Sequence, residues 1–230
     1  MSLKKFILKH FPIQNYKSYT SYSQDGEDMI LKALYENRKN YKGFFVDVGA
    51  HHPVRYSNTY YFYKAGWTGI NIEPTPTIMS SFKLFRRRDT NLNMGVARTK
   101  DKLTFYCFNE PALNTFSEEV AKRVDSADNK YRITKELQVD VLPLSEILDL
   151  HVPRGRKIDF LSIDVEGLDF EVLQSNDWTK YKPQYLLVED NSVLDKVPES
   201  EVYHYLADIG YKPIAKTLRT LIFEYSDAVI

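Results

Sequence analysis

The chain has 230 residues, 43% of them hydrophobic and 27% charged, and its 31 basic and 31 acidic side chains cancel to zero net charge. This length predicts a single domain over residues 1–230, and the lack of a basic excess argues against a dedicated nucleic-acid-binding protein. The chain has one cysteine, Cys107, so it cannot form an internal disulfide. This cysteine content and the absence of a secretory signal pattern at the start predict a cytoplasmic protein. No run approaches the roughly 20 apolar residues of a membrane span.

The N-terminal segment, residues 1–40, is predicted to be helical. Residues 1–11 are basic and partly apolar, which is typical of a helical or loose lead-in. Farther on, Asp25, Glu27 and Asp28 precede an apolar run, as at a helix N-terminus, where acids favour the positive end of the dipole. The spacing of this run places four side chains on one helical face: Met29, Ile30, Ala33 and Leu34. We expect this helix to end near Asn37.

Strands and helices alternate over the following part of the chain. Strands are predicted at 44–48, 67–72 and 91–96, and helices at 60–65 and 77–85. Ser57, Asn58 and Thr59 form a plausible cap for the first of these helices. The arginines at 86–88 close the second helix and are predicted to be solvated. This order predicts a parallel, doubly wound α/β sheet.

Residues 101–142 interrupt the alternation and predict an insertion over the ligand-binding edge of the sheet. Extended pieces are expected at 103–108 and 130–141, and long excursions of this kind are often lids or binding loops. Asn114 and Thr115 in this insertion are candidates for the acceptor pocket. The alternation then resumes with a helical turn at 144–148, a strand at 157–164, a helix to about 173, a strand at 185–190, a helix at 199–210 and a hairpin of 211–215 and 219–225.

Acidic residues stand at the ends of four predicted strands. They are Asp47, Glu73, Asp164, and Glu189 with Asp190. Ligands bind outside the carboxyl ends of the strands in open α/β sheets, so these acids are expected to converge on one site. Glu73 follows the second strand, about two dozen residues beyond Gly49, where an acid commonly binds the two hydroxyls of an adenosine ribose.

The turn after the first strand is unusual for a dinucleotide site. Gly49 stands without the second and third glycines of G-x-G-x-x-G and is followed by Ala50, His51, His52 and Pro53. An acidic rim would repel a pyrophosphate, whereas it suits a nucleoside cofactor that carries positive charge, such as S-adenosylmethionine. An NAD-dependent sugar oxidoreductase is the first alternative. A non-catalytic glycan-binding domain is the second, because the chain has 17 tyrosines.

Several short segments, in this order along the chain, resemble the FkbM family of S-adenosylmethionine-dependent methyltransferases. They are Ser23–Asp28, Phe45–His51, Ser57–Thr59, Gly66-Trp67, Ile72–Pro74 and Ile163–Gly167. The resemblance runs from about residue 20 to 190. It implies a class I methyltransferase fold, with a seven-stranded, mostly parallel sheet whose last strand is antiparallel. It also implies O-methylation, commonly of a sugar hydroxyl on a glycan, antibiotic or polysaccharide precursor. The His51-His52-Pro53 stretch departs from the broader methyltransferase pattern, which has more glycine there.

Site roles follow from the motifs and this resemblance. Cofactor contacts are expected from Gln24, Glu27, Asp47, Gly49, Ala50, Asn58, Thr59, Glu73, Asn93 and Asp164. A hydroxyl acceptor needs a base, for which His51 and His52 are the candidates and Asp164 the rival. Acceptor contacts are expected from Asn114, Thr115, Glu166, Glu189 and Asp190.

Structural alternatives stay open for most of these residues. Asp47 could be a buried acid bound by backbone N–H groups, Asn93 a turn residue, and Glu166 a helix cap. Asn58 and Thr59 could serve only as caps. Asp164, Glu166, Glu189 and Asp190, with a histidine, could also hold a divalent metal through oxygen ligands, although a metal-free site is favoured.

Overall fold

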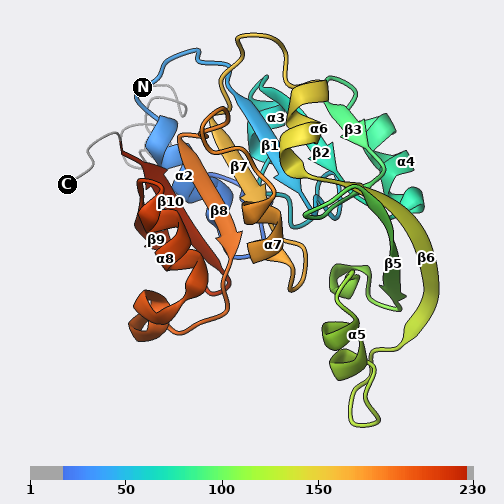
Figure 1. Cartoon of the computed structure of the whole chain (residues 1–230). Coiled ribbons are helices and arrows are strands. Elements are labelled where there is room, and N and C mark those ends of the chain that lie inside the picture. The colour runs from blue at the N-terminus through green and yellow to red at the C-terminus, as the bar shows by residue number, and fades with distance from the viewer. Residues whose placement is uncertain (1–17, 227–230) are drawn as a thin grey trace, which may run out of the picture.

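A seven-stranded sheet runs through the molecule in the order β3-β2-β1-β7-β8-β10-β9 (Figure 1). The computed structural model describes residues 18–226, so the prediction for residues 1–11 lies outside the described residues. The strands are β1 (Phe44–Val48), β2 (Thr68–Ile72), β3 (Thr90–Leu92), β7 (Phe160–Ile163), β8 (Tyr185–Glu189), β9 (Tyr211–Lys216) and β10 (Thr220–Tyr225). The first five of these are parallel, and β10 runs antiparallel to β8 and β9. The predicted mostly parallel sheet with a terminal antiparallel hairpin is confirmed.

Helices cover both faces of this sheet, because the central strands are apolar on both sides. All five residues of β1 are buried. Phe44, Val46 and Val48 belong to one apolar cluster, and Phe45 belongs to another on the opposite face, as the period of two in a strand requires. The first cluster includes side chains of α6 (Leu144–His151), α7 (Asp169–Gln174) and α8 (Glu201–Asp208), and the second includes side chains of α2 (Glu27–Tyr35) and α3 (Tyr60–Lys64).

Part of the predicted face of α2 is confirmed, because Ile30 and Leu34 pack against the second apolar cluster. Leu31 and Tyr35 are buried, whereas Ala33 is exposed, and the helix ends at Tyr35. At the N-terminus of this helix, Asp28 is fully buried. Its carboxylate accepts hydrogen bonds from the Ser21 hydroxyl (2.7 Å) and from the Tyr22 amide (2.7 Å). These bonds tie the start of the helix to the segment that precedes it.

The predicted strand at 91–96 is divided between two sheets. Its first half is β3, and its second half, β4 (Gly95–Val96), joins a second sheet in the order β4-β6-β5. The long strands β5 (Asp101–Phe108) and β6 (Ile133–Leu142) form a ribbon that extends from the main sheet (Figure 1). Residues 101–142, which also contain η2 (Pro111–Leu113) and α5 (Glu118–Val124), are called the arm below.

The helix α5 was missed by the sequence prediction, although it has a normal cap. The Ser117 hydroxyl accepts a hydrogen bond from the Val120 amide (3.2 Å), and two acids occupy the first turn. The remaining elements are α4 (Pro76–Phe85), which packs beside β3, and η3 (Leu194–Glu199) before α8. Among residues 18–226, no helix combines the length and apolar character needed to cross a membrane.

Candidate active site

A cavity of about 900 Å³ opens at the carboxyl ends of β1, β2 and β7. This volume includes space that is open to solvent. The arm forms one wall through Phe105, Phe116 and residues of η2. Ten residues singled out from the sequence line the cavity: Gln24, Asp47, Gly49, Ala50, His51, Asn58, Glu73, Asn114, Asp164 and Glu166. The strand-end position is the one where open α/β sheets bind ligands.

The turn at Gly49 brings the ends of three strands into contact. Gly49 has φ +77°, and a Cβ built on it would lie 1.7 Å from the carbonyl oxygen of Asp164. The amides of Gly49 and Ala50 both donate to the carbonyl oxygen of Ile72, at 3.0 and 3.1 Å. Any side chain at position 49 would therefore collide with the backbone that follows β7.

Asp47 lies at the bottom of the cavity, 5% exposed. Its Oδ2 accepts a hydrogen bond from the Thr59 hydroxyl at 2.8 Å. Burial raises the pKa of Asp47 to about 6, and the Thr59 hydrogen bond and the positive charge of Arg86 oppose this rise. Thr59 does not line the cavity. It is fully buried and acts on the site through Asp47.

Arg86 corrects the sequence prediction of a solvated helix end. Its side chain is completely buried, whereas Arg87 and Arg88 are exposed. The guanidinium donates to Asp89 (2.8 Å), to the Thr59 hydroxyl (2.9 Å) and to the carbonyl oxygen of Pro53 (3.1 Å), and it also reaches Ser57 and Asn71. These acceptors come from separate parts of the sequence, so local pattern alone cannot identify them.

The carboxylate of Glu73 is held by the backbone of two turns. One oxygen accepts from the His51 amide at 3.0 Å, and the other accepts from the Thr75 amide at 2.7 Å. Burial raises its pKa to about 7, although these hydrogen bonds lower it in part. The Thr75 side chain also hydrogen-bonds this carboxylate, which leaves at least one lone pair for a hydroxyl donor. Asn93 is placed outside the cavity lining and donates to the carbonyl oxygens of Glu73 and Pro74, which braces this segment.

The two histidines occupy different environments. His51, at φ +50°, lines the cavity beside the Tyr56 ring, with ring centroids 6.2 Å apart. Burial lowers its pKa to about 4, and the positive charges of His52 and Arg55 contribute. His52 is outside the lining. Its Nδ1 accepts from the Val54 and Arg55 amides, at 3.1 and 2.9 Å, and this fixes the turn.

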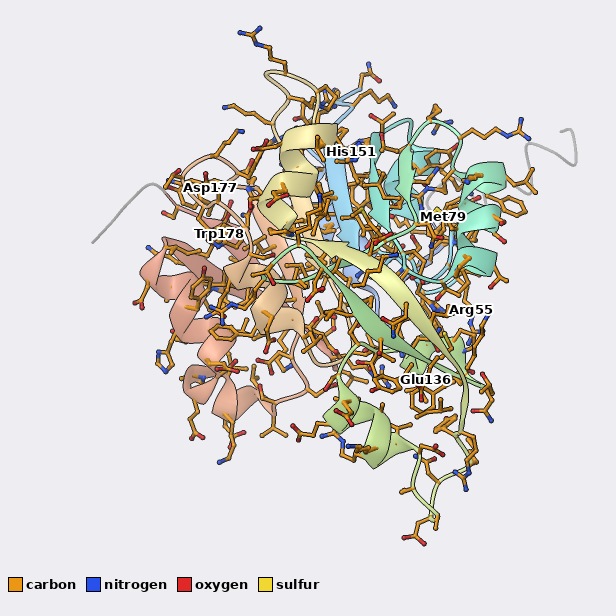
Figure 2. All side chains as sticks on the ribbon, turned by 45° about the vertical axis from the view of Figure 1, so that its right-hand side comes forward. Arg55, Met79, Glu136, His151, Asp177 and Trp178 are labelled. Atoms are coloured by element: carbon orange, nitrogen blue, oxygen red, sulfur yellow. The ribbon has the colours of Figure 1, made fainter. Side chains whose placement is uncertain are left out.

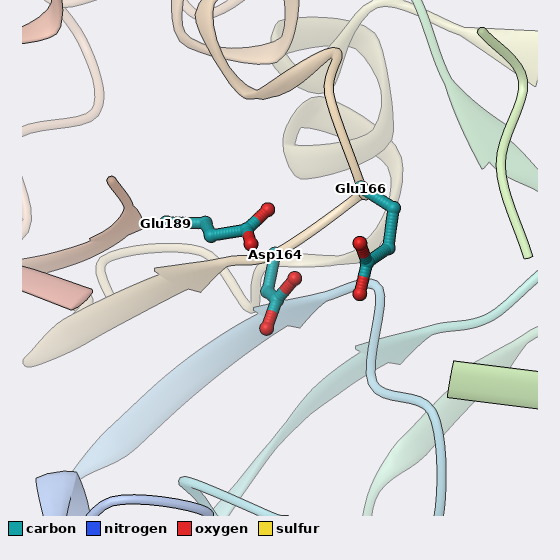
Figure 3. A group of neighbouring side chains, drawn as sticks. All are labelled: Asp164, Glu166 and Glu189. Carbon is teal, nitrogen blue, oxygen red and sulfur yellow. The ribbon is translucent and has the colours of Figure 1, made fainter. Parts of the chain in front are cut away.

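Three carboxylates gather beside the cavity at the ends of β7 and β8. Ligand oxygens of Asp164, Glu166 and Glu189 lie within 4.8 Å of one another, and Figure 3 shows Asp164 between the other two. Burial, reinforced by the neighbouring acid Glu189, raises the pKa of Glu166 to about 8. Burial and the charges of Glu189 and Glu166 raise the pKa of Asp164 well above its ordinary value. A cation placed here would relieve this repulsion.

The turn between β7 and α7 presents part of this cluster. Asp169 is buried, and its carboxylate accepts from the Val165 amide (3.1 Å) and from the Gly167 amide (3.2 Å). Burial and the charge of Glu189 raise the pKa of Asp169 to about 7. Glu166 itself has φ +55°, and its side chain lines the cavity. Asp169 thus holds the turn that precedes α7, and Glu166 does not stand at the N-cap of this helix, which is Leu168.

The structure places three further candidates outside the cavity lining. The carboxylate of Glu27 accepts from the Thr217 hydroxyl (2.7 Å) and from a backbone amide, which ties α2 to the terminal hairpin. Asp190 accepts from the hydroxyls of Ser192 and Ser200. Thr115 donates to the carbonyl oxygen of Glu166 at 2.8 Å, so it links the arm to the cluster.

Sequence reasoning missed several residues of the lining. Tyr56 is the polar aromatic residue among them, and Phe105, Phe116 and Met94 are apolar. Ser162 also lines the cavity and accepts a hydrogen bond from the Asn58 amide group at 3.0 Å. A signal for Ser162 was available, because it is the polar residue within the apolar strand β7.

Comparison with known proteins supplies one family match. The family model described as the methyltransferase FkbM domain matches residues 47–213, well over half of the chain. The matched region begins at Asp47 in β1 and ends within β9, so it spans the cavity, the arm and the acidic cluster. No curated protein matches the chain.

Proposed function

Since the chain belongs to the FkbM methyltransferase domain family, we propose that it transfers a methyl group from S-adenosylmethionine to a hydroxyl oxygen of a sugar. Family membership implies the methyl transfer and its donor. The observation that supports the assignment to this cavity is the set of carboxylates at its strand ends. Asp47, Glu73 and Asp164 all line one space at the end of a parallel sheet.

The residues present fit the donor. S-adenosylmethionine, when bound, supplies a methyl group activated by the positive charge of its sulfonium. The Asp164 carboxyl would ionise beside the cationic amino-acid portion, because a nearby positive charge lowers the pKa of a carboxyl group, and Glu73 keeps a lone pair for the ribose hydroxyls. Gly49 lets the turn after β1 pack against the backbone of Asp164, because a Cβ there would lie 1.7 Å from the Asp164 carbonyl oxygen. Asp47 lies behind this turn, held by Thr59.

The acceptor is proposed to lie between His51 and the arm. This side of the cavity combines the ring of Tyr56 with polar groups of His51 and Asn114, a combination that suits the faces and hydroxyls of a sugar. Positioning supplies much of the acceleration in a displacement of this kind. His51 is neutral above pH about 4, so at neutral pH it has an unprotonated ring nitrogen for the hydroxyl proton, and its low pKa makes it a weak base. Asp164 is the alternative base.

The family match supports methyl transfer over hydride transfer from a nicotinamide cofactor, and over glycan binding without catalysis. A metal-free site remains our preference. If a divalent cation is involved, the geometry offers the oxygens of Asp164, Glu166 and Glu189 as its ligands. The carboxylate of Asp190 already accepts hydrogen bonds from the hydroxyls of Ser192 and Ser200. The free thiol of Cys107 accords with a reducing compartment, and we propose a cytoplasmic location.

Calorimetric titration with S-adenosylhomocysteine tests the donor site. We expect saturable binding to the wild type and an affinity reduced by about tenfold or more in Glu73→Gln, because a charge-assisted hydrogen bond is lost. Glu118→Gln, a change of the same kind on α5 outside the cavity lining, should bind like the wild type. Failure of the wild type to bind at high ligand concentration would refute the proposal. Mass spectrometry of a panel of sugar nucleotides and glycans then identifies the methylated acceptor.

A further inference from the structure

A second large concavity lies at the opposite end of the sheet, where β1, β7 and β8 begin. It spans about 1930 Å³, including space that is open to solvent, and is called the basic groove here. Its cationic lining residues are Arg38, Arg154, Arg156, Lys157, Lys180 and Lys182. Figure 2 shows this end at the top, where nitrogen-tipped side chains project beyond His151, far from Arg55 and Glu136 at the cavity end. The methyl-transfer proposal makes no use of the groove.

Most of these cations have no acidic partner among residues 18–226. Lys180 pairs with Asp149. Arg38 and Arg156 donate to neutral groups, the side-chain oxygen of Gln184 and the carbonyl oxygen of Lys42, and Lys182 donates to the Tyr225 hydroxyl. Within the described part of the chain, Arg154 and Lys157 make no hydrogen bond or ion pair. The positive charge of the groove is therefore available to a ligand.

The groove is built on a fixed scaffold. Asp159, 5% exposed, accepts from the Phe44 amide (2.7 Å) and from the Tyr41 hydroxyl (2.6 Å), which joins two walls. The Arg156 amide donates to the carbonyl oxygen of Pro153 at 2.9 Å, and this closes a turn that presents Arg154 at its corner. The cations are thus carried by the 38–42 loop, the 153–157 turn and the 180–184 segment.

We propose that the basic groove binds a linear anionic glycan. Its space is much larger than one anionic group needs, and its cations come from three segments along its walls, so a chain with repeated negative charges fits better than a single phosphate. A concave surface does not match a flat bilayer. Nucleic-acid grooves offer free aromatic faces to bases. Here the Tyr41 ring already stacks on Tyr35, and the amines of Lys180 and Lys182 lie over the rings of Tyr181 and Tyr225.

The proposal is tested with oligogalacturonate, a carboxylate-bearing glycan, titrated into the full chain at low salt. We expect saturable binding that weakens with added salt, and no binding of a neutral dextran oligosaccharide of equal length. The double variant Arg154→Glu/Lys157→Glu should raise the Kd by about tenfold or more, because two free cations become anions. The matched control Arg98→Glu/Lys100→Glu, in an exposed loop outside the groove, should bind like the wild type.

Binding of S-adenosylhomocysteine and an unchanged Tm check that the double variant is folded, since its substitutions lie at the opposite end of the sheet from the cavity. These readouts also separate failure of this proposal from failure of the methyl-transfer proposal. Three results would overturn the inference. The first is no binding of oligogalacturonate by the wild type, and the second is an equal loss of oligogalacturonate affinity in the two double variants. The third is binding of single-stranded DNA of equal charge, or of phosphatidylserine vesicles, that is tighter than the binding of oligogalacturonate.

Discussion

Gly49, after the end of β1, packs directly against the backbone of Asp164, the residue after β7. A Cβ at position 49 would lie 1.7 Å from the carbonyl oxygen of Asp164 and 2.8 Å from its carbonyl carbon. Because these are backbone atoms, a rotamer change cannot relieve the collision. The contact therefore fixes the distance between two strand ends that line the candidate active site.

Gly49→Ala is predicted to lower the free energy of unfolding by about 2 to 5 kcal/mol, since left-handed strain and overpacking add. Gly155→Ala is the matched control, because Gly155 has φ +76° but nothing within 4 Å of a Cβ. It should cost about 1 kcal/mol, from the strain alone. Urea denaturation measures both values. If both variants lose the same free energy of unfolding, the close contact between position 49 and the Asp164 backbone does not add to the destabilisation.

Arg86→Met is predicted to destabilise the protein by about 3 to 5 kcal/mol, because Asp89 would keep a buried charge without its partner. It should also weaken S-adenosylhomocysteine binding, since Thr59 loses the donor that fixes its position beside Asp47. Arg87→Met, an exposed neighbour, should change stability by no more than about 0.5 kcal/mol. Denaturation and calorimetry on both variants check this. If Arg86→Met lowers the free energy of unfolding no more than Arg87→Met does, Arg86 does not organise this part of the fold.

The acidic cluster predicts a stability that falls as pH rises. The pKa of Glu166 is about 8 in the folded protein, compared with an ordinary value of 4.5, so the folded state holds a proton that the unfolded state has released. Stability from this group is present below pH about 4.5 and is lost as pH rises to about 8. Glu166→Gln should therefore have a higher Tm than the wild type at pH 8, by about 2–4 °C for each kcal/mol recovered.

Near pH 4.5 the Tm values of Glu166→Gln and the wild type should converge. Glu119→Gln, in the first turn of α5 and exposed, is the control and should follow the wild type at every pH. Thermal scans across this pH range make the comparison. If Glu166→Gln has the same Tm as the wild type at pH 8, ionisation of the Glu166 carboxylate does not destabilise the native protein.

The acid limb of the pH–rate profile distinguishes His51 from Asp164 as the base that takes the acceptor's hydroxyl proton. The pKa of His51 is about 4, so with His51 as the base kcat/KM should fall only near that pH. The pKa of Asp164 lies well above its ordinary value, so with Asp164 as the base the limb should lie well above 4. His51→Asn should lower kcat by about 10²–10⁴ if His51 takes the proton. His52→Asn, outside the cavity lining, should leave the position of the limb unchanged.

The arm is predicted to control acceptor binding without affecting donor binding. Thr115→Val removes the hydrogen bonds that its hydroxyl donates to the carbonyl oxygen of Glu166 and accepts from the Ser117 amide, and should raise the acceptor KM by roughly fivefold or more, since each such bond contributes about 1 kcal/mol. The Kd for S-adenosylhomocysteine should stay the same. Thr134→Val loses a similar bond to the carbonyl oxygen of Cys107 within the arm and is the control. Equal effects of the two variants on KM would contradict this prediction.

Much of the fold follows from local pattern. The apolar runs that end at Val48, Ile72 and Ile163 are strands in one parallel sheet, because buried strands need apolar residues on both faces. The acids that follow or end these runs lie near one another for the same reason: parallel strands end at one edge. Patterning of this kind depends on near neighbours in sequence, so it is readable without knowledge of the fold.

The rest depends on partners that are distant in sequence. Nothing near Arg86 distinguishes it from Arg87, and its burial follows from acceptors at Pro53, Thr59 and Asn71. The division of residues 91–96 between two sheets requires β6, which begins at Ile133. Tyr56 lines the cavity only because the turn after β1 folds back over it. Such contacts are products of the tertiary structure, and periodicity does not encode them.

The base of the arm has a consequence for protein engineering. Gly95 and Val96 pair in register with Val141 and Leu142, so the chain leaves the core and returns to it at adjacent points. A segment whose two ends are neighbours is exchangeable as a cassette, because a graft need only reproduce the closing pair. Replacing residues 97–140 with the equivalent stretch of a related protein would thus give a chimaera with a new wall of the candidate active site on an unaltered seven-stranded sheet.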